Sequence, residues 1–128
     1  MPKAKQLSVS VENRPGTLAQ VASVLGDAKV NILAFLTTLS NGEGAVHAVV
    51  DNVNKAKKAL DSAGLSYTES DVLYVELPNA TGSLGKFAGK LAAKEINITS
   101  GYATVTKGSR KASLVLAVSD LEKASRIR

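Results

Sequence analysis

Asparagine and glycine recur at matching positions in two segments of the chain, and their spacing could bind a small charged ligand. Residues 11–35 read VENRPGTLAQVASVLGDAKVNILAF, and residues 77–101 read LPNATGSLGKFAGKLAAKEINITSG. The matching apolar residues fall at core spacings, but the Asn and Gly residues fall in predicted loops, where packing alone does not require them. A duplication that retains polar loop residues in both copies indicates that a ligand-binding site has been retained.

Two short segments in each copy carry this chemistry: a strand-to-helix turn, and an Asn-Ile pair at the start of the next strand. A helix N-terminus presents unpaired N–H groups that suit a carboxylate. An Asn side chain offers a donor and an acceptor, and glycine lets a ligand approach the backbone. The predicted ligand is therefore a small zwitterion, an α-amino acid. The candidate ligand-binding residues are Asn13, Arg14, Pro15, Gly16, Thr17, Leu18, Asn31, Ile32, Asn79, Thr81, Gly82, Ser83, Leu84, Asn97 and Ile98.

The same residues also have purely structural interpretations. The Asn of each turn can form an Asx-turn, and the Gly can simply be a turn residue. The Asn of each Asn-Ile pair can be a left-handed residue between helix and strand. The residue types leave both interpretations open.

Hydrophobic periodicity predicts the elements that position these residues. In the first copy, residues 31–39 are apolar on both faces, which is typical of a strand covered on two sides. Pro15 suits the first position of a helix, Asp51 or Asn52 can cap the second helix, and Gly64 can end it. The predicted order is strand 6–12, helix 18–28, strand 31–39, strand 45–50, helix 53–63 and strand 66–70.

The second copy repeats this order but is shorter. We predict a strand at 72–77, a helix at 83–94, a hairpin of 97–106 with 111–118, and a helix from Asp120. The predicted domains are therefore residues 1–70 and 71–128. The last strand of the second copy is missing, which would leave an exposed edge. Another chain covers that edge, or the end is frayed, or the sequence is cut short.

Composition excludes several classes of site. There are 128 residues and no cysteine, so disulfides, thiolate nucleophiles and cysteine metal sites are excluded. His47 is the only histidine, which excludes a histidine metal cluster. We predict no catalytic residue, no metal and no cofactor. No stretch is long and apolar enough to span a membrane, and we expect a cytoplasmic protein.

The net charge of +5 makes nucleic acid a conceivable partner. The basic residues, however, lie on predicted solvated helix faces, as Lys86, Lys90 and Lys94 do, where they usually confer solubility. The chain also lacks the aromatic-rich strands on which RNA bases stack. Nucleic acid is therefore not the predicted partner.

The arrangement of strand, Asn-x-Pro-Gly-x-Leu, helix, Val-Asn-Ile, hairpin and helix resembles the ACT domain, and the whole chain resembles a tandem pair. The resemblance implies an α+β fold of two ferredoxin-like βαββαβ units, with antiparallel sheets and helices on one face. It also implies that domains pair through their second strands and bind amino acids at that interface. The first loop would then face Asn97, and the second loop would face Asn31.

The chain departs from the family pattern at a few positions. Amino-acid-binding relatives often have His two residues before the loop Asn, where this chain has Val11 and Leu77, and Thr81 replaces the usual Pro. The resulting prediction is a non-catalytic sensor of an amino acid, a homodimer that regulates a metabolic enzyme in trans. The alternative is a protein–protein interaction scaffold with empty ligand sites.

Overall fold

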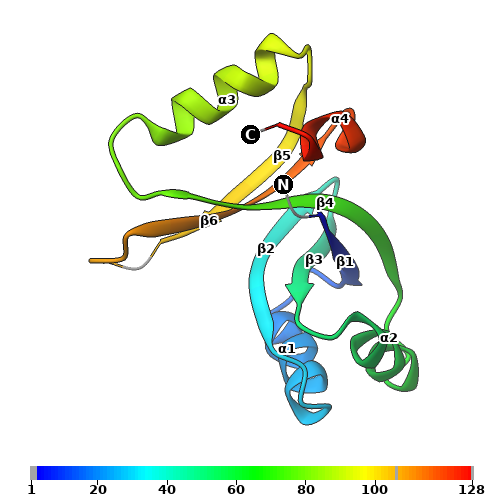
Figure 1. Cartoon of the computed structure of the whole chain (residues 1–128). Helices are drawn as coiled ribbons and strands as arrows, with labels where there is room; N and C mark the ends of the chain where they lie inside the picture. The colour runs from blue at the N-terminus through cyan, green and yellow to red at the C-terminus, as the bar shows by residue number, and fades with distance from the viewer. Residues whose placement is uncertain (1–2, 106, 128) are drawn as a thin grey trace. The chain divides into compact units, whose positions relative to one another are not determined.

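The computed structural model describes residues 3–105 and 107–127, which form ten helices and strands (Figure 1). Six strands and four helices alternate as α+β. The described part contains no helix long and apolar enough to cross a membrane. The elements are β1 (Lys3–Val11), α1 (Thr17–Asp27), β2 (Ile32–Ser40), β3 (Glu43–Val50), α2 (Val53–Ser62), β4 (Tyr67–Pro78), α3 (Ser83–Ala93), β5 (Ile98–Thr104), β6 (Lys111–Val118) and α4 (Leu121–Ser125).

The chain divides into two compact units. The N-terminal unit is Lys5–Ser70, and the C-terminal unit is Asp71–Arg128 together with the described residues Lys3 and Ala4. Within the C-terminal unit, Lys3 forms an ion pair with Glu122. The start of β1 is therefore grouped with the C-terminal unit, which the sequence did not predict. The predicted domain boundaries at residues 70 and 71 stay a prediction.

The N-terminal unit has the strand order of a ferredoxin-like fold, and the three described strands of the C-terminal unit follow the matching order. The hydrogen-bonded order is β2-β3-β1-β4 in the N-terminal unit, and β4-β6-β5 in the C-terminal unit. The β1–β3, β2–β3, β4–β6 and β5–β6 pairs are antiparallel. The strands predicted at 66–70 and 72–77 are one continuous strand, β4, which runs through Asp71. The βαββαβ prediction is confirmed.

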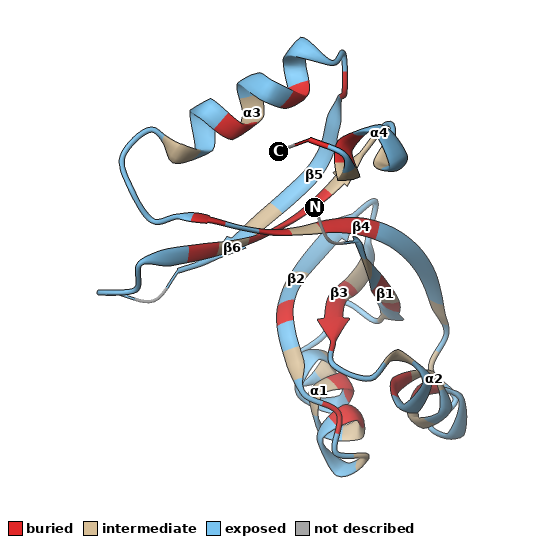
Figure 2. Ribbon diagram, viewed as in Figure 1, coloured by how far each residue is buried: buried red, intermediate tan, exposed pale blue. Residues whose placement is uncertain are grey.

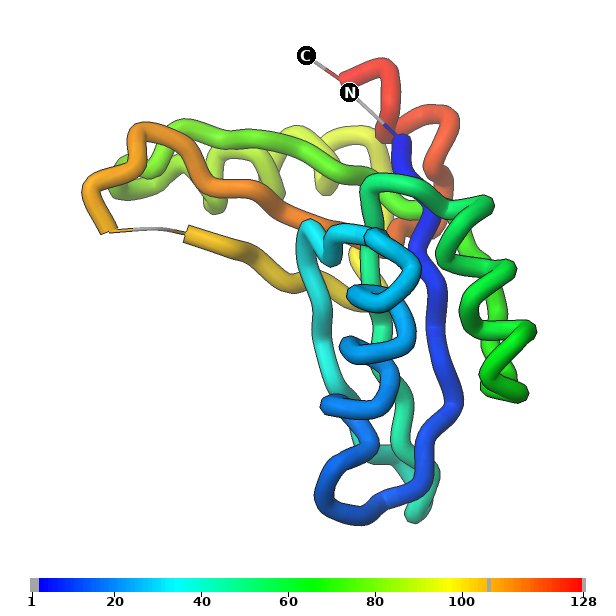
Figure 3. The backbone as a smooth tube through the Cα atoms, turned by 90° about the horizontal axis from the view of Figure 1, so that it is seen from below, coloured from blue at the N-terminus to red at the C-terminus, as the bar shows by residue number. Residues whose placement is uncertain are grey.

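Each unit has its own apolar core between its helices and one face of its strands (Figure 2). Leu7 and Val9 of β1 pack with Val21 and Leu25 of α1 in the first core. Figure 3 shows α1 lying along the strands of its own unit. Leu91 of α3 is the repeat partner of Leu25 and is equally buried in the second core. The apolar matches Leu25/Leu91 and Val30/Ile96 of the duplication are therefore core positions.

The helix boundaries have identifiable causes. Asn52 caps α2 by accepting a hydrogen bond from Lys55 N at 3.1 Å, and Asp120 caps α4 in the same way from Lys123 N at 3.0 Å. Gly64 follows α2 with a φ of 71°, the left-handed conformation predicted for it. Pro15 does not occupy the first helical position, since α1 begins two residues later.

Candidate functional site

The first strand-to-helix loop leaves the start of α1 without a side-chain cap. Gly16 is the N-cap residue, with a φ of 93° and no side chain to accept a hydrogen bond. The hydroxyl of Thr17 instead donates to the carbonyl of Arg14 at 3.3 Å. The N–H groups of the first turn therefore remain available as donors, as predicted for a carboxylate site.

Beside this helix start lie a cation and a carboxylate. Arg14 Nε donates to Glu12 Oε2 at 2.7 Å, and both side chains are exposed. The side chain of Asn13, between them in the sequence, makes no hydrogen bond to any described residue. The loop thus presents a positive group, a negative group and an uncommitted amide, which together complement a zwitterion.

These residues line a pocket of about 230 Å³ within the N-terminal unit, here called the loop pocket. Four predicted site residues line it: Asn13, Arg14, Thr17 and Leu18. Sequence reasoning missed the rest of the wall, which consists of Val11 and Glu12 before the loop and of residues of β2 and β3. The register explains this wall, since Val11 pairs with Gly44 and Gly44 pairs with Leu39. The lining residues that were missed are Val11, Glu12, Thr37, Thr38, Leu39, Gly44, Ala45 and Val46.

The second loop has a similar backbone conformation, but its asparagine makes different hydrogen bonds. Gly82 is again the N-cap, with a φ of 85° and no side-chain cap. Asn79 Nδ2, however, donates to the carbonyl of Ser109 at 3.0 Å, and Asn79 N donates to the carbonyl of Arg110 at 2.8 Å. The second asparagine therefore ties its loop to the β5–β6 turn. The Asx-turn interpretation predicted a hydrogen bond to a residue nearby in the sequence, whereas the Asn79 side chain bonds to the distant hairpin turn.

The second-strand asparagines join a strand start to a helix start through their backbones. Asn31 N donates to Asp51 Oδ1 at 2.9 Å, and Asn97 N donates to Ser119 Oγ at 2.9 Å. The left-handed interpretation of these asparagines is wrong, because the positive φ values belong to Lys29 and Glu95, two residues earlier. Both asparagines are exposed.

Within the N-terminal unit, Asn31 does not join the loop pocket. Ile32 pairs with Val50 at one end of the β2–β3 ladder, and Leu39 pairs with Gly44 near the loop at the other end. Ile32 packs against the core, and Ile98 is 40% exposed. Pro15 is exposed next to the pocket, and Thr81, Ser83 and Leu84 lie in and after the second loop. The predicted pairing of each loop with the asparagine of a facing domain stays a prediction.

His47 is half-buried on β3 between two hydroxyl groups. Ser8 Oγ lies 2.8 Å from its Nδ1, and Thr38 Oγ1 lies 2.9 Å from its Nε2. Both ring nitrogens are therefore engaged. Among the described residues no carboxylate joins this group, so the ring lacks the acidic partner that orients a histidine base.

Comparison with known proteins agrees with this architecture. A structure of protein BT0572 from Bacteroides thetaiotaomicron matches with a TM-score of 0.89 and 30% identity, over 96% of this chain and 84% of that one. The ligand-free regulatory subunit of aspartate kinase from Thermus thermophilus matches with a TM-score of 0.69 and 15% identity, over 97% and 88% of the two chains. No curated protein matches the chain. The model of the ACT domain pair matches residues 3–127, and the chain belongs to this family.

Proposed function

We propose that the chain is a non-catalytic regulatory protein whose loop pocket binds a small amino acid. The observation that carries the proposal is the loop pocket, where an uncapped helix start, Arg14 and Asn13 surround about 230 Å³. That volume lies below the range of about 300–1,000 Å³ typical of drug-sized ligands, so it suits a small metabolite. The Thermus thermophilus neighbour is itself a regulatory subunit, which is consistent with a regulatory role, although its likeness establishes the fold alone.

The charges of the pocket suggest how the ligand lies. The guanidinium of Arg14 and the N–H groups at the start of α1 would bind the α-carboxylate. Glu12 would accept from the α-ammonium, and the amide of Asn13 would bridge the two groups. A second ACT domain placed against β2 would close the pocket, and ligand would then favour the paired state in proportion to its differential affinity.

A thermal shift screen against the twenty amino acids tests this proposal. Ligand at one hundred times its dissociation constant should add about 2.7 kcal/mol to the free energy of unfolding. The Asn13→Ala variant should lose most of that gain, whereas Asn79→Ala should retain it, because the Asn79 amide is already bonded to Ser109. A flat screen at millimolar concentrations would reject amino-acid binding.

A second candidate function, a protein-interaction scaffold, is favoured by the exposed apolar edge of β2. This strand has a hydrogen-bonded neighbour on one side only among the described strands. Its side chains Leu33, Phe35 and Leu39 are 43%, 51% and 59% exposed, although the sequence predicted a strand covered on both faces. An unpaired apolar edge of this kind suits pairing with another strand.

The oligomeric state tests the scaffold directly. We expect a homodimer in sedimentation, and we expect the Phe35→Lys variant to be monomeric with unchanged secondary structure. A dimer that forms equally with and without amino acids, combined with a flat ligand screen, would favour the scaffold over the sensor. A wild-type monomer at all concentrations would reject the scaffold.

A further inference from the structure

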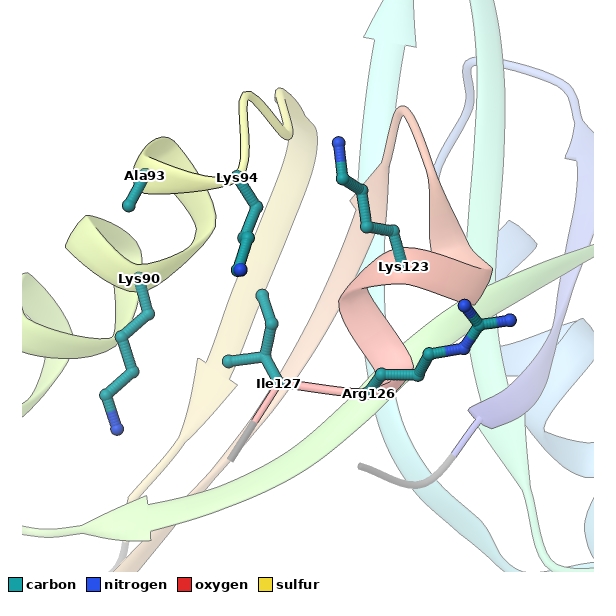
Figure 4. Close-up of a pocket in the computed structure, with 6 residues that line it drawn as sticks. All are labelled: Lys90, Ala93, Lys94, Lys123, Arg126 and Ile127. Carbon is teal, nitrogen blue, oxygen red and sulfur yellow. The ribbon is translucent and has the colours of Figure 1, made fainter.

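A basic groove lies between α3 and α4, within the C-terminal unit and apart from the loop pocket (Figure 4). It encloses about 560 Å³ and is lined by Lys90, Ala93, Lys94, Lys123, Arg126 and Ile127. Four of these six residues are cationic, and none is acidic. Such a volume falls within the range that accommodates small ligands, about 300–1,000 Å³.

A backbone hydrogen bond at the C-terminal end of a helix positions each side of the basic groove. Lys94 is the C-cap of α3, and its N–H donates to the carbonyl of Leu91 at 3.1 Å. On the other side, the N–H of Ile127 donates to the carbonyl of Ala124 at 3.1 Å. Ile127 is buried against the core, and Figure 4 shows the Lys94 side chain extending toward it. The groove therefore has an apolar floor and a cationic rim.

Three of the four rim charges are not neutralised by neighbouring carboxylates. Within the described part of the chain, Lys94, Lys123 and Arg126 take part in no ion pair. Like charges that line the same groove from α3 and α4 repel each other, and an anionic ligand between them would relieve that repulsion. The charge pattern is therefore complementary to a polyanion.

The N-terminal unit provides an internal comparison, because it has the same helices with different residues. Lys90, Ala93 and Lys94 align with Val24, Asp27 and Ala28 of the first copy. Val24 and Ala28 pack against the first core. These three differences alone make the C-terminal copy more positive by three charges: one for each lysine and one for the loss of the aspartate.

The second helices of the two copies differ less in charge. The caps Asn52 and Asp120 align, so Lys55 corresponds to Lys123 and Lys58 corresponds to Arg126. Lys55 Nζ donates to the carbonyl of Lys29 at 3.5 Å, so in the first copy this position bonds to the backbone after α1. The buried Ala56 of α2 matches the buried Ala124 of α4, so this core position is the same in both copies while the groove surface differs.

We propose that the basic groove binds a nucleoside triphosphate, with its phosphates on the cationic rim and its nucleoside against Ala93 and Ile127. Lysine and arginine form charge-assisted hydrogen bonds with phosphate oxygens, and Arg126 can engage them in bidentate fashion. The apolar floor is the part of the groove that free phosphate would leave uncovered. This site is independent of the amino-acid site proposed above.

Titration calorimetry of the whole chain with ATP and GTP tests the proposal. We expect saturable binding of at least one of them. Adenosine and inorganic triphosphate should each bind at least tenfold more weakly, because each covers only half of the groove. Lys94→Ala and Arg126→Ala should each weaken binding about tenfold. If Lys94→Ala does not fold, Lys90→Gln takes its place.

The control is Lys58→Ala, which removes one charge at the position of the first copy that matches Arg126. It should leave nucleotide affinity unchanged, and all these variants should keep the amino-acid response of the wild type. Absence of nucleotide binding at millimolar concentration would overturn the proposal. Equal losses in Lys58→Ala and Arg126→Ala, or equally tight binding of a sulfated polysaccharide, would also overturn it by indicating non-specific attraction to a basic protein.

Discussion

Two asparagines at equivalent positions should respond differently to the same substitution. Asn79 donates to the carbonyl of Ser109 at 3.0 Å, whereas the side chain of Asn13 bonds to no described residue. A neutral hydrogen bond contributes a net 0.5–1.5 kcal/mol, roughly. Because Asn79 is exposed, water can replace the lost donor, and the lower part of that range applies. We therefore expect Asn79→Ala to reduce the free energy of unfolding by about 0.5–1 kcal/mol, and Asn13→Ala to leave it unchanged within about 0.5 kcal/mol.

The substitution to aspartate sharpens this contrast. Asn79→Asp keeps the shape of the side chain but replaces its donor with an acceptor that faces the Ser109 carbonyl. It should destabilise the fold more than Asn79→Ala, because two acceptors then oppose each other. Asn13→Asp has no such opposing carbonyl among its contacts and should remain near the wild-type stability.

Urea unfolding monitored by circular dichroism measures these differences. The midpoint should fall for the two Asn79 variants with an unchanged m value, which would indicate a change in stability alone. In thermal unfolding, the loss should lower the Tm by roughly 2–6 °C. Equal effects at residues 13 and 79, or a larger effect at residue 13, would refute the assignment of a structural role to one asparagine and a binding role to the other.

Three further predictions concern the backbone, a helix cap and a half-buried phenol. Gly16→Ala should lower the free energy of unfolding by about 1–2 kcal/mol, since its φ of 93° disfavours a Cβ although nothing crowds one; chemical denaturation measures this. Asn52→Ala should cost about 1 kcal/mol in the same assay through loss of the α2 cap. Burial, with a smaller contribution from Tyr74, raises the pKa of Tyr102 to about 12 from its ordinary value of 10.0. The folded chain then holds this proton more tightly than the unfolded chain, so stability should fall as the pH rises from 10 toward 12, and Tyr102→Phe should reduce that fall in denaturation curves.

The local features of the fold could be predicted from the sequence because they depend on near neighbours. The helices have apolar spacings, and Asn52 supplies a cap for α2, so α1, α2 and α3 begin and end close to the predicted residues. The boundary between the copies was harder to predict, since the predicted strands 66–70 and 72–77 are separated by Asp71 alone. Nothing in the residue pattern distinguishes two strands from the single strand β4.

The features that the sequence could not provide depend on contacts between distant residues. The bond from Asn79 to Ser109 joins residues thirty positions apart, so the residue type alone left two interpretations open. The wall of the loop pocket follows from the β1–β3–β2 register rather than from any motif. From the sequence of α3 alone, its lysines were predicted to form a solvated face that confers solubility. The groove that they share with α4 becomes visible only in the folded structure.

The grouping of Lys3 and Ala4 with residues 71–128 makes the C-terminal unit discontinuous in sequence. During synthesis, the ribosome makes this short piece before the N-terminal unit and the remainder only after the whole N-terminal unit has emerged. The two copies therefore cannot be separated cleanly into two fragments. Dividing the chain between residues 70 and 71 would separate Lys3 from its ion-pair partner Glu122. An affinity tag fused just before Lys3 would accordingly lie next to the C-terminal unit, although it is attached at the N-terminal end of the sequence.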